Sequence, residues 1–327
     1  MSLPPQWRWK LDRLRERITA FFAPDKPEEA RPRLCPSCGT LVGARVNRCH
    51  ECGANMNFGM AAVSKSVREA IPEETPVTYG LLGLNFMIFT ITLLASAQAA
   101  EAASEGFSLF GGMDGRVLLR LGARKSDLLL AGEWWRLVMP IFLHGGLLHL
   151  GMNMFVLKDL GPALENVYGS GRYLFLYMIT GVLGFTWTTA WDVLTLTRAV
   201  PLSSPLFGLY LSQYRGISVG ASGSLMGLLG LAIAITTLRG GSFAQAIRGQ
   251  LLRSAAFVLV LGLVVPGIDN AAHIGGLVSG FLLGRVVSDR EPMNPAERAR
   301  ANAMGWAGGL LIVGSFAAMI TRFLAGN

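Results

Sequence analysis

Long apolar segments alternate with polar ones along most of the chain, and this alternation predicts membrane-spanning helices. A helix needs about 20 mostly apolar residues to cross the hydrocarbon core of a bilayer. Segments of this kind are residues 79–99, 147–167, 172–193, 220–238, 250–268, 270–288 and 303–323. The pattern therefore predicts an all-α, polytopic membrane protein with seven spans.

The composition supports this interpretation. Hydrophobic residues make up 51% of the 327 residues and charged residues only 15%, whereas about 25% of the residues of a soluble globular domain are charged. A soluble globular protein is therefore excluded. The net charge of +8 would be weak evidence for nucleic-acid binding in a soluble protein, but here the loops explain it, and we do not expect nucleic acid as a partner.

The distribution of Lys and Arg between the loops predicts the orientation. With the N-terminus inside, the inner segments hold more than twice as many of these residues as the outer ones. Most of the outer ones lie in the long first outer loop, residues 100–146, and long loops count for less under this rule. The polar N-terminal region shows no signal peptide. We therefore expect a cytoplasmic N-terminus, an external C-terminus and a location in a bacterial inner membrane.

The region before the first span divides into three predicted parts. Residues 1–32 combine a basic amphipathic pattern with a linker, and the pattern fits a helix on an anionic membrane surface and a helix packed on the next domain equally well. Residues 33–54 form a small cysteine-containing domain and residues 55–78 a linker. The membrane core is expected at 79–288, followed by a cytoplasmic linker and the seventh helix at 289–327.

All four cysteines lie in two Cys-x-x-Cys-Gly motifs, Cys35–Gly39 and Cys49–Gly53. Each glycine allows the tight turn that directs two thiolates toward one ion, and four thiolates favour a closed, tetrahedral zinc site with a structural role. A region this short cannot build a hydrophobic core, so the metal would have to fold it. We predict a zinc-ribbon-like domain with one structural Zn²⁺. The predicted ligands are Cys35, Cys38, Cys49 and Cys52.

A redox-active dithiol is the alternative for these motifs. It is disfavoured because the surrounding sequence shows no thioredoxin-like βαβ pattern. His50, inside the second motif, is expected to be a bystander. The sequence does not identify what the ribbon binds: a protein partner fits, and a DNA-binding role stays open.

Polar residues able to do chemistry lie in the first turns of three spans. They are His149 and Asn153 in the second span, Ser222 in the fourth and His273 in the sixth. Even-numbered spans run in the same direction, so the three groups lie at one depth beneath one membrane face. Polar groups at this depth are costly and usually functional. Together they indicate a serine hydrolase that works inside the bilayer.

Glycines on the fourth and sixth spans predict that Ser222 and His273 meet. The two stripes are Gly223, Gly227 and Gly230, and Gly276, Gly280 and Gly284. Small residues at this spacing let two helices approach closely. Because each polar residue lies at the start of its stripe, we expect the Ser222 hydroxyl within hydrogen-bond reach of the His273 ring.

Each polar residue also has a purely structural interpretation. Ser222 alone is one small residue among packing glycines, and its surroundings differ from the Gly-x-Ser-x-Gly elbow of α/β-hydrolases. His149 and Asn153 share a helix face at i and i+4. This pair suits an oxyanion site or an interhelical hydrogen-bond pair worth about 0.6–2 kcal/mol, and the two roles are compatible.

From Gly132 to Arg285 the chain resembles the rhomboid family of intramembrane serine proteases. The matching stretches are Gly132–Leu137, Phe142–His149 with Asn153, Gly161–Glu165, Tyr168–Ser170, Gly220–Gly223 and Ala272–Gly276. The resemblance implies a bundle of six core helices, here with a seventh at the C-terminal end. It implies a reaction without a cofactor, in which single-span membrane proteins are cut near the outer face, at small residues with helix-weakening residues nearby.

The resemblance also implies roles for single residues. Ser222 would be the nucleophile and His273 the general base, in a dyad without a carboxylate. The oxyanion would be held by His149, Asn153 and the backbone N–H of Ser222. The positions of the family's structural motifs are Trp135, Arg136, Glu165, Gly276 and Gly280.

One position departs from the family pattern. Met226 occupies a position where family members often carry an aromatic residue that stacks on the histidine, although a thioether can also pack against a ring.

The alternative function is a non-catalytic rhomboid-like protein that binds or extracts membrane helices, but such relatives have generally lost the serine or the histidine. A transporter is disfavoured because the sequence shows no internal repeat.

Overall fold

The structure is a computed structural model, and it describes only part of the chain. The described residues are 33–35, 40–43, 46, 48–52, 75–102, 112–196, 216–290 and 292–325. The chain divides into two compact units, Met1–Ala70 and Ile71–Asn327. The predicted N-terminal amphipathic helix and Cys38 lie outside the described residues, and the finer domain boundaries given above stay predictions.

In the first unit, two short strands pair in antiparallel fashion. They are β1 (Arg33–Leu34) and β2 (Leu41–Val42), with Arg33 opposite Val42. Cys35, directly after β1, packs with Val42 and Cys49 in a small buried cluster. A cluster of this size cannot stabilise a fold by hydrophobic burial, so the described part of this unit needs another source of stability.

In the second unit, every segment predicted to span the membrane is a helix. The helices are α3 (Pro76–Ala102), α6 (Leu147–Tyr168), α7 (Ser170–Leu196), α9 (Ser222–Arg239), α10 (Gly241–Val264), α11 (Asn270–Val286) and α12 (Pro295–Leu324). By length and composition, 5 of them are able to cross a membrane, namely α3, α7, α9, α10 and α12. The predicted all-α polytopic fold is confirmed.

The other two predicted spans, α6 and α11, are less typical of membrane helices. The polar residues Lys158, Asp159 and Glu165 lower the mean hydropathy of α6, and α11 has only 17 residues. Both helices nevertheless pack against α7 and α9 within the bundle. Both helices are therefore held in the bundle by their neighbours.

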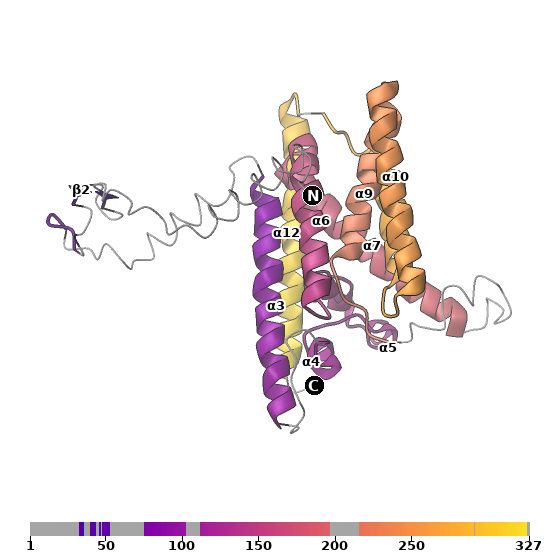
Figure 1. The fold of residues 1–327 in the computed structure, drawn as a ribbon, viewed down its shortest axis with the longest axis horizontal. Coiled ribbons are helices and arrows are strands. Elements are labelled where there is room, and N and C mark those ends of the chain that lie inside the picture. Colours follow the sequence, from indigo (N-terminus) through magenta and orange to yellow (C-terminus); the bar gives the residue numbers. More distant parts are fainter. Residues whose placement is uncertain are drawn as a thin grey trace, which may run out of the picture. The chain divides into compact units, whose positions relative to one another are not determined.

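The central helix of the bundle is α9, which packs against α6, α7, α10 and α11 (Figure 1). Most of its side chains are buried, whereas α10 lies at the edge, packs mainly on α9 and exposes apolar residues such as Phe257 and Val264. Exposed apolar side chains are expected where a helix faces lipid. The fold thus buries the start of α9, where Ser222 lies, and leaves α10 beside the membrane.

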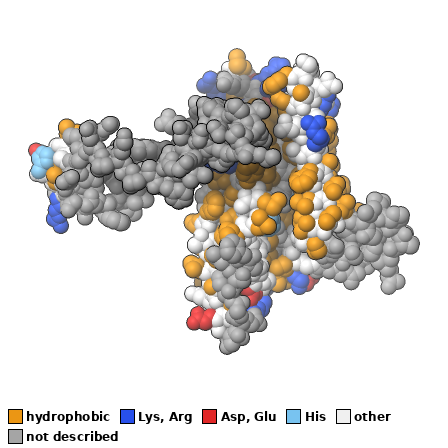
Figure 2. Space-filling model, in the orientation of Figure 1, with side chains coloured by type: hydrophobic (Ala, Val, Ile, Leu, Met, Phe, Trp, Pro, Cys, Tyr) orange, Lys and Arg blue, Asp and Glu red, His pale blue; other side chains and the backbone are white. Residues whose placement is uncertain are grey.

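Charged side chains gather at the ends of the helices. Figure 2 shows hydrophobic side chains along the middle of the bundle and basic side chains near the end where α10 begins. At this end, Arg239 of α9 lies 2.7 Å from Asp289, which follows α11 in the sequence. The hydrogen bond from the guanidinium holds the pKa of the Asp289 carboxyl below its usual value. The positive-inside rule predicts that this end faces the cytosol.

A buried carboxylate joins three helix ends in the same half of the bundle. Glu165 of α6 accepts hydrogen bonds from the amides of Val77 and Thr78, at 2.9 and 2.7 Å, in the first turn of α3. The Ser170 hydroxyl, at the start of α7, donates to the same carboxylate at 2.7 Å. The first amides of a helix lack acceptors within the helix. Glu165 therefore supplies an acceptor for α3, in agreement with an anchoring role.

The first outer loop is built from short helices. These are α4 (Gly115–Arg120), α5 (Ser126–Leu130) and the 3₁₀ helices η1 (Trp134–Leu137) and η2 (Met139–Phe142). The buried guanidinium of Arg136 lies 2.5 Å from the Glu133 carboxylate and donates to the carbonyls of Leu119 and Ala123, at 2.9 and 2.8 Å. Arg136 thereby ties η1 to the end of α4.

The seventh helix, α12, is an integral part of the bundle. It packs along α7, where a Cβ atom at Gly305 would lie 2.9 Å from the Cα atom of Gly171. Near its other end, Arg322 lies 3.4 Å from Glu133, the residue that also pairs with Arg136. The helix therefore supports the first outer loop as well as α7.

Candidate active site

Ser222 is the first residue of α9, and the segment before it is held by the first outer loop. Ser218 pairs with Arg124 through two backbone hydrogen bonds of 3.0 Å, and the Gly220 amide donates to the Pro140 carbonyl at 2.8 Å. Gly220 has a φ of 129°, a conformation that glycine adopts without steric cost. These contacts fix the turn from which the Ser222 side chain emerges.

The imidazole of His273 lies in the first turn of α11 and is in contact with this serine. Its Nε2 atom is 2.8 Å from Ser222 Oγ, and the residue is only 4% exposed. For the hydroxyl to donate to Nε2, the proton of the neutral ring must be on Nδ1. Nδ1 has no hydrogen-bond partner among the described residues. Among the described residues, the His273 ring is thus in contact with Ser222 and has no carboxylate partner.

The two predicted glycine stripes explain why these side chains meet. A Cβ atom at Gly276 would lie 2.0 Å from the Gly223 carbonyl oxygen, and one at Gly280 would lie 2.0 Å from the Gly227 carbonyl oxygen. No side chain can occupy these positions without moving a backbone. The backbones of α9 and α11 are therefore in direct contact, and this contact brings the first turns of the two helices together.

A third helix, α7, also lies against the first turns of α9 and α11, and the sequence did not lead us to expect this contact. A Cβ atom at Gly184 would lie 2.8 Å from the Ala272 carbonyl oxygen, and one at Gly181 would lie 2.2 Å from Ser224 Oγ. Gly181 and Gly184 are three residues apart and do not extend into a longer stripe. Their spacing is the signal that would have pointed to a close approach on this side.

The ring of His149 lies beside the turn that carries Ser222. A Cβ atom at Gly220 would be 2.7 Å from His149 Nε2 and 3.6 Å from Ser222 Oγ, so the ring nitrogen and the hydroxyl flank the same small space. The Gly145 amide donates to His149 Nδ1 at 3.3 Å. In a neutral imidazole the other nitrogen then carries the proton. The Nε2–H group of His149 is therefore a donor beside Ser222.

Asn153 supports this histidine from one turn further along α6. Its Nδ2 atom donates to the His149 carbonyl oxygen at 2.8 Å, so the contact lies within the helix and differs from the interhelical pair considered above. A side-chain amide carries two N–H donors. One of them braces the turn that holds His149.

Two neighbouring residues complete the surroundings. His144 is fully buried, and its ring packs edge-on against His149, with the ring centroids 5.2 Å apart. Met226, the departure from the family pattern, is buried in an apolar cluster with Leu229 and with Ala255 of α10. His144 lies in one of the matching stretches, but the sequence alone gave no reason to assign it a role.

The cysteine cluster of the first unit forms a separate candidate metal site. The Sγ atoms of Cys35, Cys49 and Cys52 lie within 4.8 Å of one another, and those of Cys35 and Cys52 are 3.6 Å apart. Thiolates at about 2.3 Å from a tetrahedral zinc ion lie roughly 3.8 Å apart. The described cysteines therefore fit a zinc site. The fourth predicted ligand, Cys38, lies outside the described residues.

Comparisons with known proteins agree with the geometry of the membrane site. Residues 131–290 match the family model for the rhomboid domain. The chain is 34% identical to the rhomboid protease GluP of Bacillus subtilis over 52% of this chain and 29% of that protein. It is 36% identical to RHOMBOID-like protein 5 of Arabidopsis thaliana over 52% of this chain and 50% of that protein.

A further relative is the rhomboid protease AarA of Providencia stuartii, with 30% identity over 51% of this chain and 60% of that protein. The alignments thus span less than two thirds of the length of each of these relatives. The fold and the match over residues 131–290 define a multi-pass membrane protein with a rhomboid domain. Residues 131–290 of the chain therefore form a rhomboid domain.

Proposed function

We propose that this protein is an intramembrane serine endopeptidase that cuts transmembrane proteins near the outer membrane face. One observation carries the proposal: Ser222 Oγ and His273 Nε2 lie 2.8 Å apart in a buried part of a membrane bundle. A hydroxyl in contact with an imidazole is the arrangement that activates a serine nucleophile. The similarity to proteins named rhomboid proteases supports the same activity.

In the proposed reaction, Ser222 Oγ attacks the carbonyl carbon of the scissile peptide while its proton passes to His273 Nε2. The tetrahedral intermediate collapses when His273 gives this proton to the leaving nitrogen, which breaks the C–N bond. A water molecule then loses a proton to His273 and attacks the acyl-serine, and the proton returns to Ser222 Oγ as the ester bond breaks. The histidine serves as base and acid in turn.

The negative charge that develops on the carbonyl oxygen needs donors close to Ser222. We propose His149 Nε2–H, the Asn153 amide and the backbone N–H of Ser222 for this role. Ser222 lies at the N-terminus of α9, where the helix dipole favours negative charge. One such donor typically contributes about 10²–10³ in rate. His149 is set for the role because the Gly145 amide fixes the proton on its Nε2 atom.

The position of the cut follows from the topology. The helices α9 and α11 both begin at the end of the bundle that is opposite to the basic residues. The positive-inside rule assigns this end to the outside. We therefore propose a protein of the bacterial inner membrane with an inner N-terminus and an outer C-terminus. Its site would lie just beneath the outer face, where water reaches it through a cavity enclosed by protein.

Activity-based labelling tests the proposal. We expect a fluorophosphonate probe to label the purified full-length protein in detergent, and mass spectrometry to map the adduct to Ser222. Ser224, which is buried two residues further along α9, is an internal reference because it lies on the same helix but does not contact His273. In proteoliposomes, the protein should also cut a single-span substrate. An unlabelled Ser222 with no cleavage would instead favour a non-catalytic protein that binds membrane helices.

We further propose that the four cysteines of the first unit bind one structural Zn²⁺. The described thiols fit such a site, and Cys38 would complete it. Zinc analysis of the purified protein is expected to give about one ion per chain for a Cys₄ site, and Cys49→Ser should abolish it. His50→Ala, which changes the neighbouring residue, should retain the metal. Equal zinc contents of wild type and Cys49→Ser would contradict the site.

A further inference from the structure

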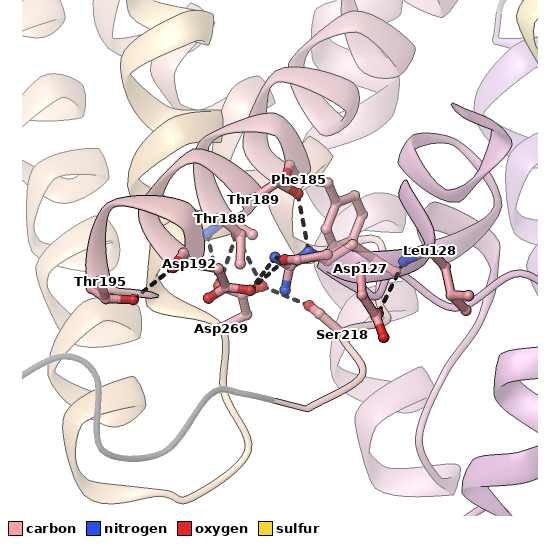
Figure 3. A network of polar contacts seen from close by, with 12 residues as sticks. Asp127, Leu128, Phe185, Thr188, Thr189, Asp192, Thr195, Ser218 and Asp269 are labelled. Atoms are coloured by element: carbon pink, nitrogen blue, oxygen red, sulfur yellow. Dashed lines mark hydrogen bonds and ion pairs between the residues drawn. The ribbon is translucent and has the colours of Figure 1, made fainter. Parts of the chain in front are cut away.

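The carboxylate of Asp269, in the turn before α11, accepts hydrogen bonds from three separate elements (Figure 3). The Ser218 hydroxyl donates to it at 2.6 Å, the Thr188 hydroxyl of α7 at 3.0 Å, and the Ala272 amide of α11 at 2.9 Å. Hydrogen bonds to an ionised carboxylate are roughly twice as strong as bonds between neutral groups. Asp269 therefore forms a strong junction between three parts of the bundle.

This junction lies one helical turn before Ser222 and His273 in the sequence. Asp269 is four residues before His273, and Ser218 is four residues before Ser222. The Asp269 carbonyl oxygen also accepts a hydrogen bond from the His273 amide at 3.1 Å. The contact between Asp269 and Ser218 thus connects the segment that carries the nucleophile to the first turn of the helix that carries the base.

Both sides of the connection are fixed by other contacts. The Ser218 backbone pairs with Arg124, whose fully buried guanidinium binds Asp192 and Thr189 of α7. Figure 3 shows Asp192 on α7 and the contact of Asp269 with Thr188 of the same helix. The end of α7 therefore holds the Ser218 segment through Arg124, and holds the start of α11 through Thr188.

We propose that Asp269 is a positioning residue of the reaction, which sets the distance between Ser222 Oγ and His273 Nε2 by holding Ser218 to the start of α11. The proposal rests on the proposed protease function. Asp269 does not touch the reacting atoms and acts through Ser218. A misplacement of about 1 Å in a reacting pair can lower a rate by about 10²-fold. Loss of the carboxylate should therefore slow the chemical step and leave the binding of a reagent unchanged.

The kinetics of fluorophosphonate labelling test this role in the full-length protein. For Asp269→Ala we expect the maximal rate of labelling to fall by about 10²-fold, with no change in the reagent concentration that gives half of this rate. Asp269→Asn keeps one acceptor oxygen in the same place and should restore part of the rate. Ser218→Ala should lower the rate in the same way. Because both changes remove one connection, the double variant should be no slower than Asp269→Ala.

A helix cap far from the site provides the matched control. Asn294 caps α12 as Asp269 caps α11: its side chain accepts a hydrogen bond from the Glu297 amide at 2.9 Å. Asn294→Ala therefore removes a cap of the same kind and should label at the wild-type maximal rate. If the two variants slow labelling equally, Asp269 acts only through general stability and the positioning role is overturned.

Other outcomes separate this inference from the proposed function. If the wild type is labelled at Ser222 and folded Asp269→Ala reacts equally fast, the positioning role fails and the protease function stands. A double variant whose loss is the product of the two single losses would also overturn it. If the wild type is not labelled at all, the proposed function itself fails. Should Asp269→Ala not fold, the maximal labelling rates of Ser218→Ala and Thr188→Val test the positioning role instead. Each of these variants removes one hydroxyl that donates to Asp269 and leaves the hydrogen bond from the Ala272 amide intact.

Discussion

Replacing His273 with alanine is expected to lower the rate of substrate cleavage by about 10⁴–10⁶-fold, and Ser222→Ala should have the same effect. Without the imidazole, no described group within hydrogen-bond distance can take the proton from Ser222 Oγ. Without the hydroxyl, no acyl-serine can form. The measurement is the initial rate of cleavage of a single-span substrate in proteoliposomes, with the reconstituted protein quantified for each variant.

Residues that act as one unit give losses that do not add. The double variant Ser222→Ala with His273→Ala should therefore be no less active than either single variant. Ser224→Ala is the matched control: this buried hydroxyl has no hydrogen-bond partner among the described residues, so its loss should preserve both activity and folding. Substantial cleavage by folded His273→Ala would show that another group serves as the base.

Gly280→Ala is expected to disrupt the bundle itself. The added methyl group would lie 2.0 Å from the Gly227 carbonyl oxygen, and a backbone atom cannot move aside as a flexible side chain can. Overpacking of a core typically costs about 1–3 kcal/mol, and we expect the upper end of this range because two helices must separate. Thermal unfolding in detergent should show the loss of stability, and labelling of Ser222 should fall because His273 moves with α11.

The matched controls are glycines in helices with open space around them. Cβ atoms at Gly83 of α3 and Gly309 of α12 would meet no atom within 4 Å. Alanine at these positions should leave labelling unchanged, and it should raise stability by up to about 1 kcal/mol because alanine favours the helix. If Gly280→Ala were as stable as these controls, the close contact between α9 and α11 would be absent.

The membrane helices and the meeting of Ser222 with His273 were predictable, because both depend on regular patterns. Hydrophobic length defined the helices, and glycines three or four residues apart on two helices of the same direction defined their contact. The enclosing role of α7 had a weaker signal, since Gly181 and Gly184 are only two glycines, three residues apart, and form no longer stripe. The catalytic role of the pair stays a prediction that the labelling experiment decides.

The contacts between distant segments were beyond the sequence. Nothing in it shows that Ser218 meets Asp269, because this contact depends on how a loop folds over the helix ends. Asp269 carried a local signal, since an Asp directly before a helical segment is a typical N-cap. That signal predicts its contact with the Ala272 amide and is silent about its partners in other elements.

The shared carboxylate of Glu165 has a consequence for the order of assembly. During synthesis α3 emerges before α6, yet the Val77 and Thr78 amides bind a carboxylate on α6. The Ser170 hydroxyl, which shares this acceptor, arrives later still with α7. The first turn of α3 therefore gains its protein acceptor only after α6 has been inserted beside it. Until then, water is the acceptor for these amides.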